Sequence, residues 1–401
     1  MIAIRRRAPS APLLLLGLVA ALIALRLVMV AGAVAQPAEL DIRRFWEIAQ
    51  SPGRPYLSYQ VEYPPLMLAL FKLLGLTGSM HGLGAVVAVV NAFADAAIAV
   101  VLLRVWGRRA ALIWLVAALP LEQLLLSRLD LVPAACAVAA VAAVVRRRPA
   151  LAGVLLAVGA GFKLWPALLA PLLWNQLPDR SGRRRLAGGF VITAGLILLG
   201  WLMLAGPQGI VEVVTLRGAH GVQIESVSGS VIRVVTGAHP FDENEAFRVA
   251  APSWVPLAGV SAAGALLALV VCWRSRGPAS LAAGWVGAVG LLIVSSSVFS
   301  PQYVVWLLPA AVLAWEQGER RICWLVIAVA GLTMLDAEWY AAVLAGSPTA
   351  TGVLLLRNLL LLATVAVCVI RVLDDSRRTA VARRLASAAL TGRAHQLRRL
   401  G

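Results

Sequence analysis

Blocks of apolar residues that are long enough to cross a lipid bilayer recur along the whole chain. The first runs from residue 12 to residue 34, behind an arginine triplet at 5–7, and the last ends near residue 373. A membrane-spanning helix needs roughly 20 predominantly apolar residues. Hydrophobic residues make up 61% of the 401 residues, against about half in a soluble domain. We therefore predict an all-α polytopic membrane protein.

Arginine clusters between these blocks set the predicted orientation, because short arginine-rich loops face the cytoplasm. The net charge of +17 lies largely in such loops, so we interpret it as a topology signal and expect no nucleic acid partner. The first block lacks a convincing signal-peptide cleavage site and is expected to remain as the first span. Both termini are then cytoplasmic. About twelve crossings of the cell membrane are predicted, at residues 11–33, 83–103, 110–126, 129–145, 151–162, 164–174, 187–205, 255–273, 279–297, 303–315, 322–337 and 353–373.

One pair of predicted spans is expected to form a broken hairpin. Arginine clusters flank residues 151–174 on both sides, and the break is marked by Lys163 and Pro166. Lys163 and Lys72 are the only lysines of the chain, and this arginine bias is typical of a GC-rich bacterial genome.

The predicted organisation is one integral membrane domain at residues 1–375 and a basic cytoplasmic tail at 376–401. Two long extracytoplasmic loops cover about 36–82 and 206–254. Most acidic residues fall on that side, although acids contribute little to orientation, so we expect the chemistry there. The tail fits either a basic amphipathic helix on the inner leaflet or a solvated, disordered segment.

The first long loop holds two carboxylates beside helix signals. The stretch "AELDIRRFWEI" has an amphipathic pattern that places Asp41 on a short helix at the outer surface. A surface ion pair with Arg44 is the alternative to a functional role. Glu62 and Tyr63 precede a Pro-Pro step, and Pro65 is predicted to begin a helix. Glu62 can also interact favourably with the dipole of that helix.

Further polar residues lie at predicted helix ends, where charged groups are costly and tend to be functional. Arg128 and Asp130 lie at the outer end of a hairpin, where they can pair and cap the turn, or Arg128 can bind an anion. Lys163 needs either an acidic partner or an anionic ligand. Gln302 and Tyr303 lie at the outer start of another helix.

The second long loop crowds polar residues between glycines, namely Arg217, His220, Gln223 and Glu225. One histidine and one glutamate do not make a zinc site, which needs about three or four ligands, so no metal is expected. The four cysteines lack CxxC spacing and are expected to be free thiols. The acidic run at 239–245 is expected to be solvated.

These blocks together resemble a known enzyme family. The stretches "EYPPL", "RLDLVPA", "GFKLWP", "HGVQIES" and "SPQYVVWLLP", in this order between about residues 38 and 310, are similar to the polyprenol-phosphate-mannose-dependent mannosyltransferases of glycosyltransferase family 87, in the GT-C superfamily. The resemblance implies a GT-C-like fold. It implies that a hexose, expected to be mannose, passes from a polyprenyl-phosphate sugar to a lipid or glycan acceptor on the extracytoplasmic face, without a cofactor.

The resemblance also assigns roles to the residues. The general base of the family is an aspartate in the first outer loop, which corresponds to Asp41 here, and a single displacement with one base inverts the sugar carbon. Cations should stabilise the leaving phosphate, with Lys163, Arg128 and Arg217 as the candidates. The other expected substrate-binding residues are Glu62, Tyr63, Asp130, His220, Gln223, Glu225, Gln302 and Tyr303.

Two other function classes compete with this hypothesis. A transporter or flippase of a lipid-linked anionic substrate would explain intramembrane charges and broken helices, but we find no inverted repeat of the kind common in that class. A non-catalytic membrane subunit would tolerate replacement of Asp41, Lys163 and His220 without loss beyond stability.

Overall fold

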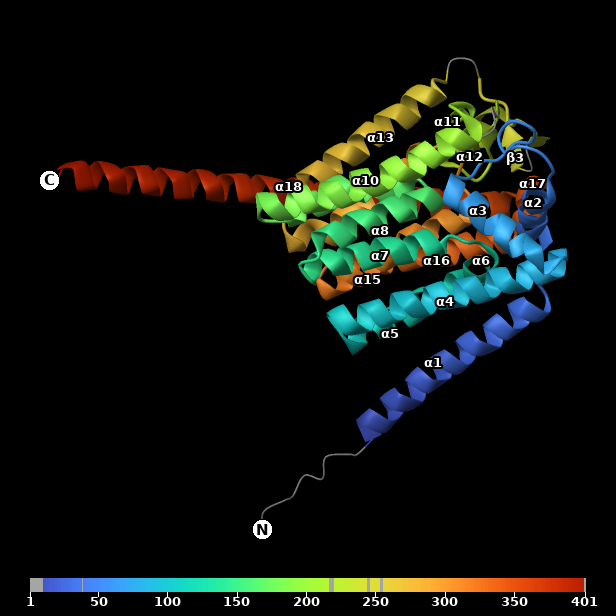
Figure 1. The fold of residues 1–401 in the computed structure, drawn as a ribbon, viewed down its shortest axis with the longest axis horizontal. Coiled ribbons are helices and arrows are strands. Elements are labelled where there is room, and N and C mark those ends of the chain that lie inside the picture. The colour runs from blue at the N-terminus through green and yellow to red at the C-terminus, as the bar shows by residue number, and fades with distance from the viewer. Residues whose placement is uncertain (1–9, 38, 216–219, 244–245, 253–254, 400–401) are drawn as a thin grey trace, which may run out of the picture.

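Long helices that lie side by side form the body of the computed structural model (Figure 1). It describes residues 10–399 apart from 38, 216–219, 244–245 and 253–254. Within these residues, five helices are long and apolar enough to span a membrane by themselves. They are α4 (Met80–Trp106), α10 (Arg180–Ala205), α13 (Leu257–Arg274), α14 (Leu281–Ser295) with the 3-10 turn η4 (Pro278–Ser280) before it, and the first part of α18 (Pro348–Arg399).

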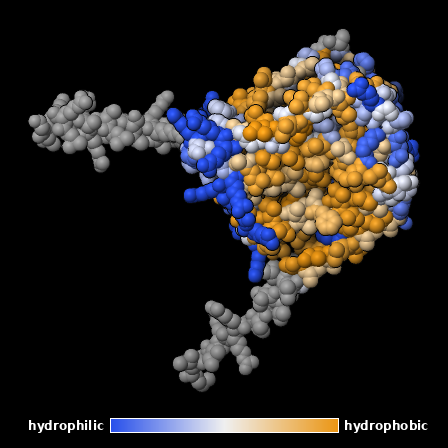
Figure 2. Space-filling view, in the orientation of Figure 1, coloured by the Kyte–Doolittle hydropathy of each residue, from blue (hydrophilic) through white to orange (hydrophobic). Residues whose placement is uncertain are grey.

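Eight further helices complete the bundle in the part of the chain that the structure describes. On the face that Figure 2 shows, a hydrophobic band separates hydrophilic residues gathered at the two ends. The membrane prediction is therefore confirmed, whereas the number of twelve crossings stays a prediction. The other bundle helices are α1 (Ser10–Ala35), α5 (Arg108–Ala117), α6 (Glu122–Ser127), α7 (Leu131–Val145), α8 (Pro149–Phe162), α9 (Leu169–Gln176), α15 (Leu308–Glu316) and α16 (Arg320–Glu338).

The expected hairpin break is present between α8 and α9. Lys163 has an extended backbone (φ −149°, ψ 140°), and a 3-10 turn, η3 (Trp165–Leu168), with Pro166 in it leads into α9. Pro166 has no N–H to donate to the carbonyl oxygen of Phe162, four residues earlier, and its ring would clash with that oxygen in a continuous helix, which accounts for the break. α8 lies directly against α10: a Cβ added to Gly153 would be 2.1 Å from the Leu186 carbonyl oxygen. The close packing of these two helices therefore requires glycine.

The first long loop folds as the sequence predicted. α2 (Glu39–Gln50) is amphipathic and buries Phe45 and Ile48. It packs on α3 (Pro65–Leu74), which begins at Pro65, with the Phe45 and Phe71 rings stacked at 4.5 Å between centroids. Lys72 of α3 closes the end of α2, because its Nζ donates to the carbonyl oxygens of Ala49 (3.0 Å) and Ser51 (2.9 Å). The two helices form one rigid unit.

The second long loop corrects the all-α prediction. Besides α11 (Gln208–Val214) and α12 (Val227–Thr236), it contains a three-stranded antiparallel sheet in the order β1-β3-β2, which comprises β1 (Val222–Gln223), β2 (Phe241–Glu243) and β3 (Ala246–Val249). Val222, Ile224 and Val249 are fully buried there and pack with Val343 of α17 (Tyr340–Leu344). Strands this short carry too little alternation to be read from a sequence.

The last helix continues past the bundle. α18 runs unbroken to Arg399, and its end extends away from the other helices in Figure 1. Of the two interpretations of the basic tail, the helix agrees with the structure. That this helix lies on the inner leaflet stays a prediction.

An ion pair within the apolar region ties α1 to the bundle. Arg26 Nε of α1 lies 3.6 Å from Asp95 Oδ2 of α4, and their side chains are only 12% and 15% exposed. Trp114 Nε1 of α5 donates to Asp95 Oδ1 at 2.7 Å. Charged groups at this position need such partners, because apolar surroundings solvate them poorly.

This pair generates a stability prediction. The Asp95→Leu variant leaves Arg26 as a lone buried charge, which costs about 3–5 kcal/mol, whereas the double variant with Arg26→Leu removes both charges. We expect the single variant to lower the apparent melting temperature in detergent more than the double variant does. Equal losses in both variants would show that the charges are not coupled.

Candidate active site

A pocket at the loop end of the bundle brings together polar residues from distant parts of the chain. This end is formed by α2, α3 and the second long loop (Figure 1). The pocket lies between α2, the link from α6 to α7, the α8–η3 break and η5 (Pro301–Trp306). It is lined by Asp41, Phe45, Tyr63, Met67, Phe71, Arg128, Leu129, Asp130, Lys163 and Gln302.

Two ion pairs cross between the elements of the pocket. Arg128 Nε lies 2.6 Å from Asp41 Oδ2, and Lys163 Nζ lies 2.6 Å from Asp130 Oδ1. Asp130 precedes α7 but its side chain makes no capping hydrogen bond, so the turn-capping interpretation of Asp130 is wrong. Asp130 Oδ1 also accepts a hydrogen bond from Trp306 Nε1 at 2.6 Å. Each of the two cations is therefore paired with a carboxylate, and all four side chains line the pocket.

Asp41 has the electrostatics of a base. Burial raises the pKa of its carboxyl above the ordinary 3.8, Arg128 and Lys163 oppose this rise, and Asp130 adds to it. A general base works best when its pKa approaches the operating pH. The geometry thus gives Asp41 a stronger affinity for a proton than an exposed aspartate has.

Aromatic rings fix Lys163 in the pocket. Its Nζ lies 5.3 Å from the Tyr303 ring centroid and 5.4 Å from that of Trp306, and these two rings stack at 4.2 Å. Cation–π contacts of this kind attract the ammonium group to the faces of the two rings. Tyr303, which was predicted to bind substrate, therefore packs against Lys163 and helps to hold its ammonium group in place.

The segment at residues 297–302 holds Arg128. Arg128 Nη1 donates to Ser300 Oγ at 2.8 Å and also to Gln302 Oε1. Together with the ion pair to Asp41, these bonds engage two nitrogens of the guanidinium, whose planar fork leaves little rotational freedom.

Glu62 and Tyr63 have different positions. Tyr63 lines the pocket, and its ring meets the Phe71 ring edge-on at 4.9 Å. The Glu62 carboxylate accepts hydrogen bonds from Arg44 Nε (3.1 Å) and Nη2 (2.8 Å). Of the two described residues, Tyr63 lines the pocket and Glu62 does not. Glu62 braces α2 against the rest of the first loop.

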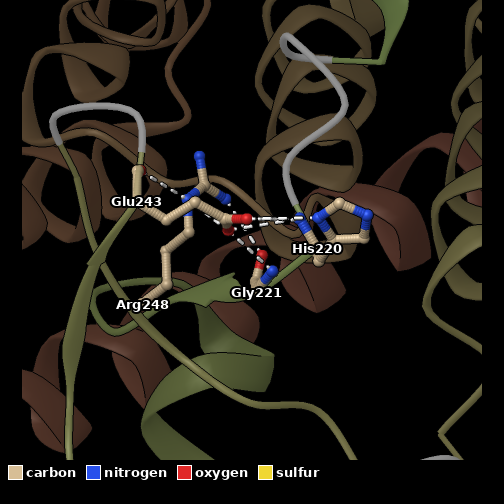
Figure 3. A network of polar contacts seen from close by, with 4 residues as sticks. All are labelled: His220, Gly221, Glu243 and Arg248. Carbon is tan, nitrogen blue, oxygen red and sulfur yellow. Dashed lines mark hydrogen bonds and ion pairs between the residues drawn. The ribbon is translucent and has the colours of Figure 1, made fainter.

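Part of the second loop lies apart from the pocket. Arg217 falls outside the described residues, and the His220 side chain is 92% exposed, with Nδ1 3.3 Å from Glu243 Oε1. Figure 3 shows the Glu243 carboxylate facing the backbone of His220 and Gly221, beside Arg248. Backbone N–H donation from Gly221, and then from His220, lowers the pKa of Glu243. The expectation that the run at 239–245 is solvated holds for the exposed His239, Phe241 and Asp242, but not for Glu243, which is partly buried and accepts these backbone hydrogen bonds.

Gln223 and Glu225 are buried behind the pocket. Gln223 Nε2 donates to Glu225 Oε2 at 2.7 Å. Burial, followed by the nearby Asp336, raises the pKa of Glu225 to about 7. Sequence reasoning missed the residues that surround it, Arg357 and Asn358 of α18, although a charged side chain inside the apolar stretch 353–373 is a signal that it needs a partner.

Among the described residues, no group of three or more His, Cys, Asp or Glu side chains is placed to hold a metal ion. The described donors of the pocket suit an anion instead, since Arg128 and Lys163 carry several N–H groups each.

One comparison with known proteins gives a match. The family model described as Glycosyltransferase family 87 matches residues 61–301, more than half of the 401-residue chain. The matched range includes Arg128, Asp130 and Lys163, whereas Asp41 lies before it and Gln302 directly after it. No curated protein matches the sequence.

The raised pKa of Glu225 generates a prediction for stability. Because the folded protein holds this proton more tightly than the unfolded chain does, the stabilisation is complete below pH 4.5 and is lost as the pH rises through about 7. The shift corresponds to about 3 kcal/mol. We expect the Glu225→Gln variant to gain apparent melting temperature relative to the wild type between pH 5 and pH 8. A difference that does not change with pH would contradict the assignment.

Proposed function

Since this chain belongs to glycosyltransferase family 87 and is a membrane glycosyltransferase, we propose that it transfers a hexose from a polyprenyl-phosphate donor to a lipid or glycan acceptor. We further propose that the sugar is mannose and that transfer occurs on the extracytoplasmic face of the cell membrane. The observation that carries this proposal is the meeting of one partly buried base, Asp41, with two cations, Arg128 and Lys163, in one pocket.

Asp41 acts as the general base in this proposal. The acceptor hydroxyl attacks the anomeric carbon of the sugar while the bond from that carbon to the phosphate oxygen breaks. The hydroxyl proton passes to Asp41, whose Oδ2 is held by Arg128 at 2.6 Å. The fixed carboxylate orientation aligns its other oxygen for the incoming hydroxyl.

The two cations stabilise the leaving group. Polyprenyl phosphate gains negative charge as the bond breaks, so donors that already point into the pocket favour the transition state. Lys163 has three N–H groups, and the bond to Asp130 uses one of them. The remaining N–H groups can donate to phosphate oxygens.

The state of the second acid supports a single displacement with inversion. A retaining route needs a second carboxylate as a nucleophile. Asp130 is 3% exposed, and its Oδ1 is engaged by both Lys163 and Trp306. A carboxylate held in this way is a poor nucleophile, so Asp130 positions Lys163.

Loss of the base generates the main activity prediction. We expect Asp41→Asn to lower kcat at least 100-fold, since general base catalysis contributes about 10²–10⁴-fold. The assay measures transfer of radiolabelled mannose from polyprenyl-phosphate mannose by the purified protein in liposomes. In the wild type, activity should fall as the pH decreases through the raised pKa of Asp41, because protonation removes the base.

The matched control is Glu47→Gln, on the exposed side of the same helix. It should keep wild-type activity. Full activity of a folded Asp41→Asn protein would remove Asp41 from this role.

A second activity prediction concerns the phosphate. The double variant Lys163→Met with Asp130→Asn removes the cation without leaving a lone buried carboxylate. We expect kcat to fall about 100-fold, the usual loss when one preorganised donor is removed. The same double variant should fold as the wild type does in size-exclusion chromatography. Retention of activity would show that Arg128 alone serves the leaving group.

A further inference from the structure

Arg357 is a fully buried arginine that does not line the pocket. Its side chain is 0% exposed, and it belongs to the part of α18 that is apolar enough to span the membrane. Burying a charge is costly unless it is paired and hydrogen-bonded. The position therefore calls for an explanation beyond helix packing.

The Arg357 guanidinium contacts three separate elements. Its Nη2 donates to the Glu225 carbonyl oxygen at 2.5 Å, and its Nη1 lies 3.7 Å from Asp336 Oδ2 of α16. The guanidinium carbon lies 4.1 Å from the centroid of the Phe299 ring. One planar group thus touches a bundle helix, the second long loop and the segment at 297–302.

The two loops that Arg357 contacts are joined to each other and to the pocket. The Gln223 backbone N–H donates to the Ser297 carbonyl oxygen at 3.0 Å. Phe299 directly precedes Ser300, which accepts a hydrogen bond from Arg128. A continuous set of contacts therefore leads from Arg357, through Phe299 and Ser300, to the guanidinium that pairs with Asp41.

A purely structural role for Arg357 would be to dock the second loop on α18. Asn358 already contributes to that docking, since its Nδ2 donates to Ser230 Oγ of α12 at 2.8 Å. What distinguishes Arg357 is its contact with Phe299, which belongs to the segment that holds Arg128.

We propose that Arg357 is a positioning residue: it fixes the 297–302 segment against the second loop and thereby sets the orientation of Arg128 toward Asp41. The consequence for sugar transfer rests on the proposed function, whereas the placement of Arg128 does not.

The experiment measures the protonation of Asp41 without any substrate. Purified full-length protein is treated with a small carbodiimide, which reacts with protonated carboxyls, and labelling of Asp41 is quantified by mass spectrometry against pH. The charged groups that face Asp41 are Arg128, Asp130 and Lys163. Of these, Arg128 forms the ion pair that lowers the pKa of Asp41, so a displaced Arg128 raises it.

The test variant is Arg357→Met combined with Asp336→Leu, which removes both members of the buried ion pair. We expect the labelling midpoint of Asp41 to move upward by about one pH unit. Arg357→Lys, which keeps the charge but loses the planar face and the fork, should give a smaller upward shift. The control Arg371→Met, on the same helix but paired with Glu319 and Asp375, should leave the midpoint unchanged.

An unchanged midpoint in a folded double variant, or in Arg357→Lys if the double variant does not fold, would overturn the proposal. Sugar transfer gives a second readout: kcat should fall about 10-fold or more, with the acidic limb of its pH profile moved by the same amount as the labelling midpoint. A midpoint shift in a protein whose wild type transfers no sugar would refute the proposed function and leave the positioning role intact.

Discussion

The need to pair each buried charge organises the loop end of this molecule. Apolar surroundings solvate a lone charge poorly, so each charged side chain at the pocket must find its counter-charge on another element. Arg128 pairs with Asp41 of the first loop, and Lys163 at the end of α8 pairs with Asp130 at the start of α7. These two pairs draw the α2 unit, the α6–α7 link and the α8–α9 break together, and they leave spare donors directed into the same space.

Much of this could be predicted, because the signals are local. Amphipathic spacing identified α2, and proline identified the start of α3. A lysine three residues before a proline identified the break in the α8–α9 hairpin. The choice of partners could not be predicted in the same way. Arg128 and Asp130 are two residues apart and carry opposite charges, yet each makes an ion pair with a residue from a distant segment. Pairing of this kind depends on tertiary packing, which a single sequence does not display.

Two residues that take part in the proposed arrangement, Asp41 and Arg357, lie outside the family match. The match covers residues 61–301, which supply Arg128, Asp130 and Lys163. Asp41 comes from the helix before this range, and Arg357 comes from the last helix after it. The matched range thus provides the cations Arg128 and Lys163. The proposed base, Asp41, and the proposed positioning residue, Arg357, come from the segments before and after it. The buried position of Arg357 was visible in the sequence only as one charge in an apolar run, with nothing to indicate its partners.

The glycine contact between α8 and α10 gives the hairpin the mechanics of a lever. Gly153 of α8 and Gly189 of α10 lie where the two backbones touch, and Lys163 lies ten residues beyond Gly153, about 15 Å away on a helical rise of 1.5 Å per residue. A side chain at the fulcrum that tilts α8 by about 4° would move the tip by about 1 Å. Displacements of that size at reacting groups can cost about 100-fold in rate. A methyl group near the arginine-flanked start of α8 would therefore change the geometry of the pocket at the other end of this helix, without touching any residue that lines it.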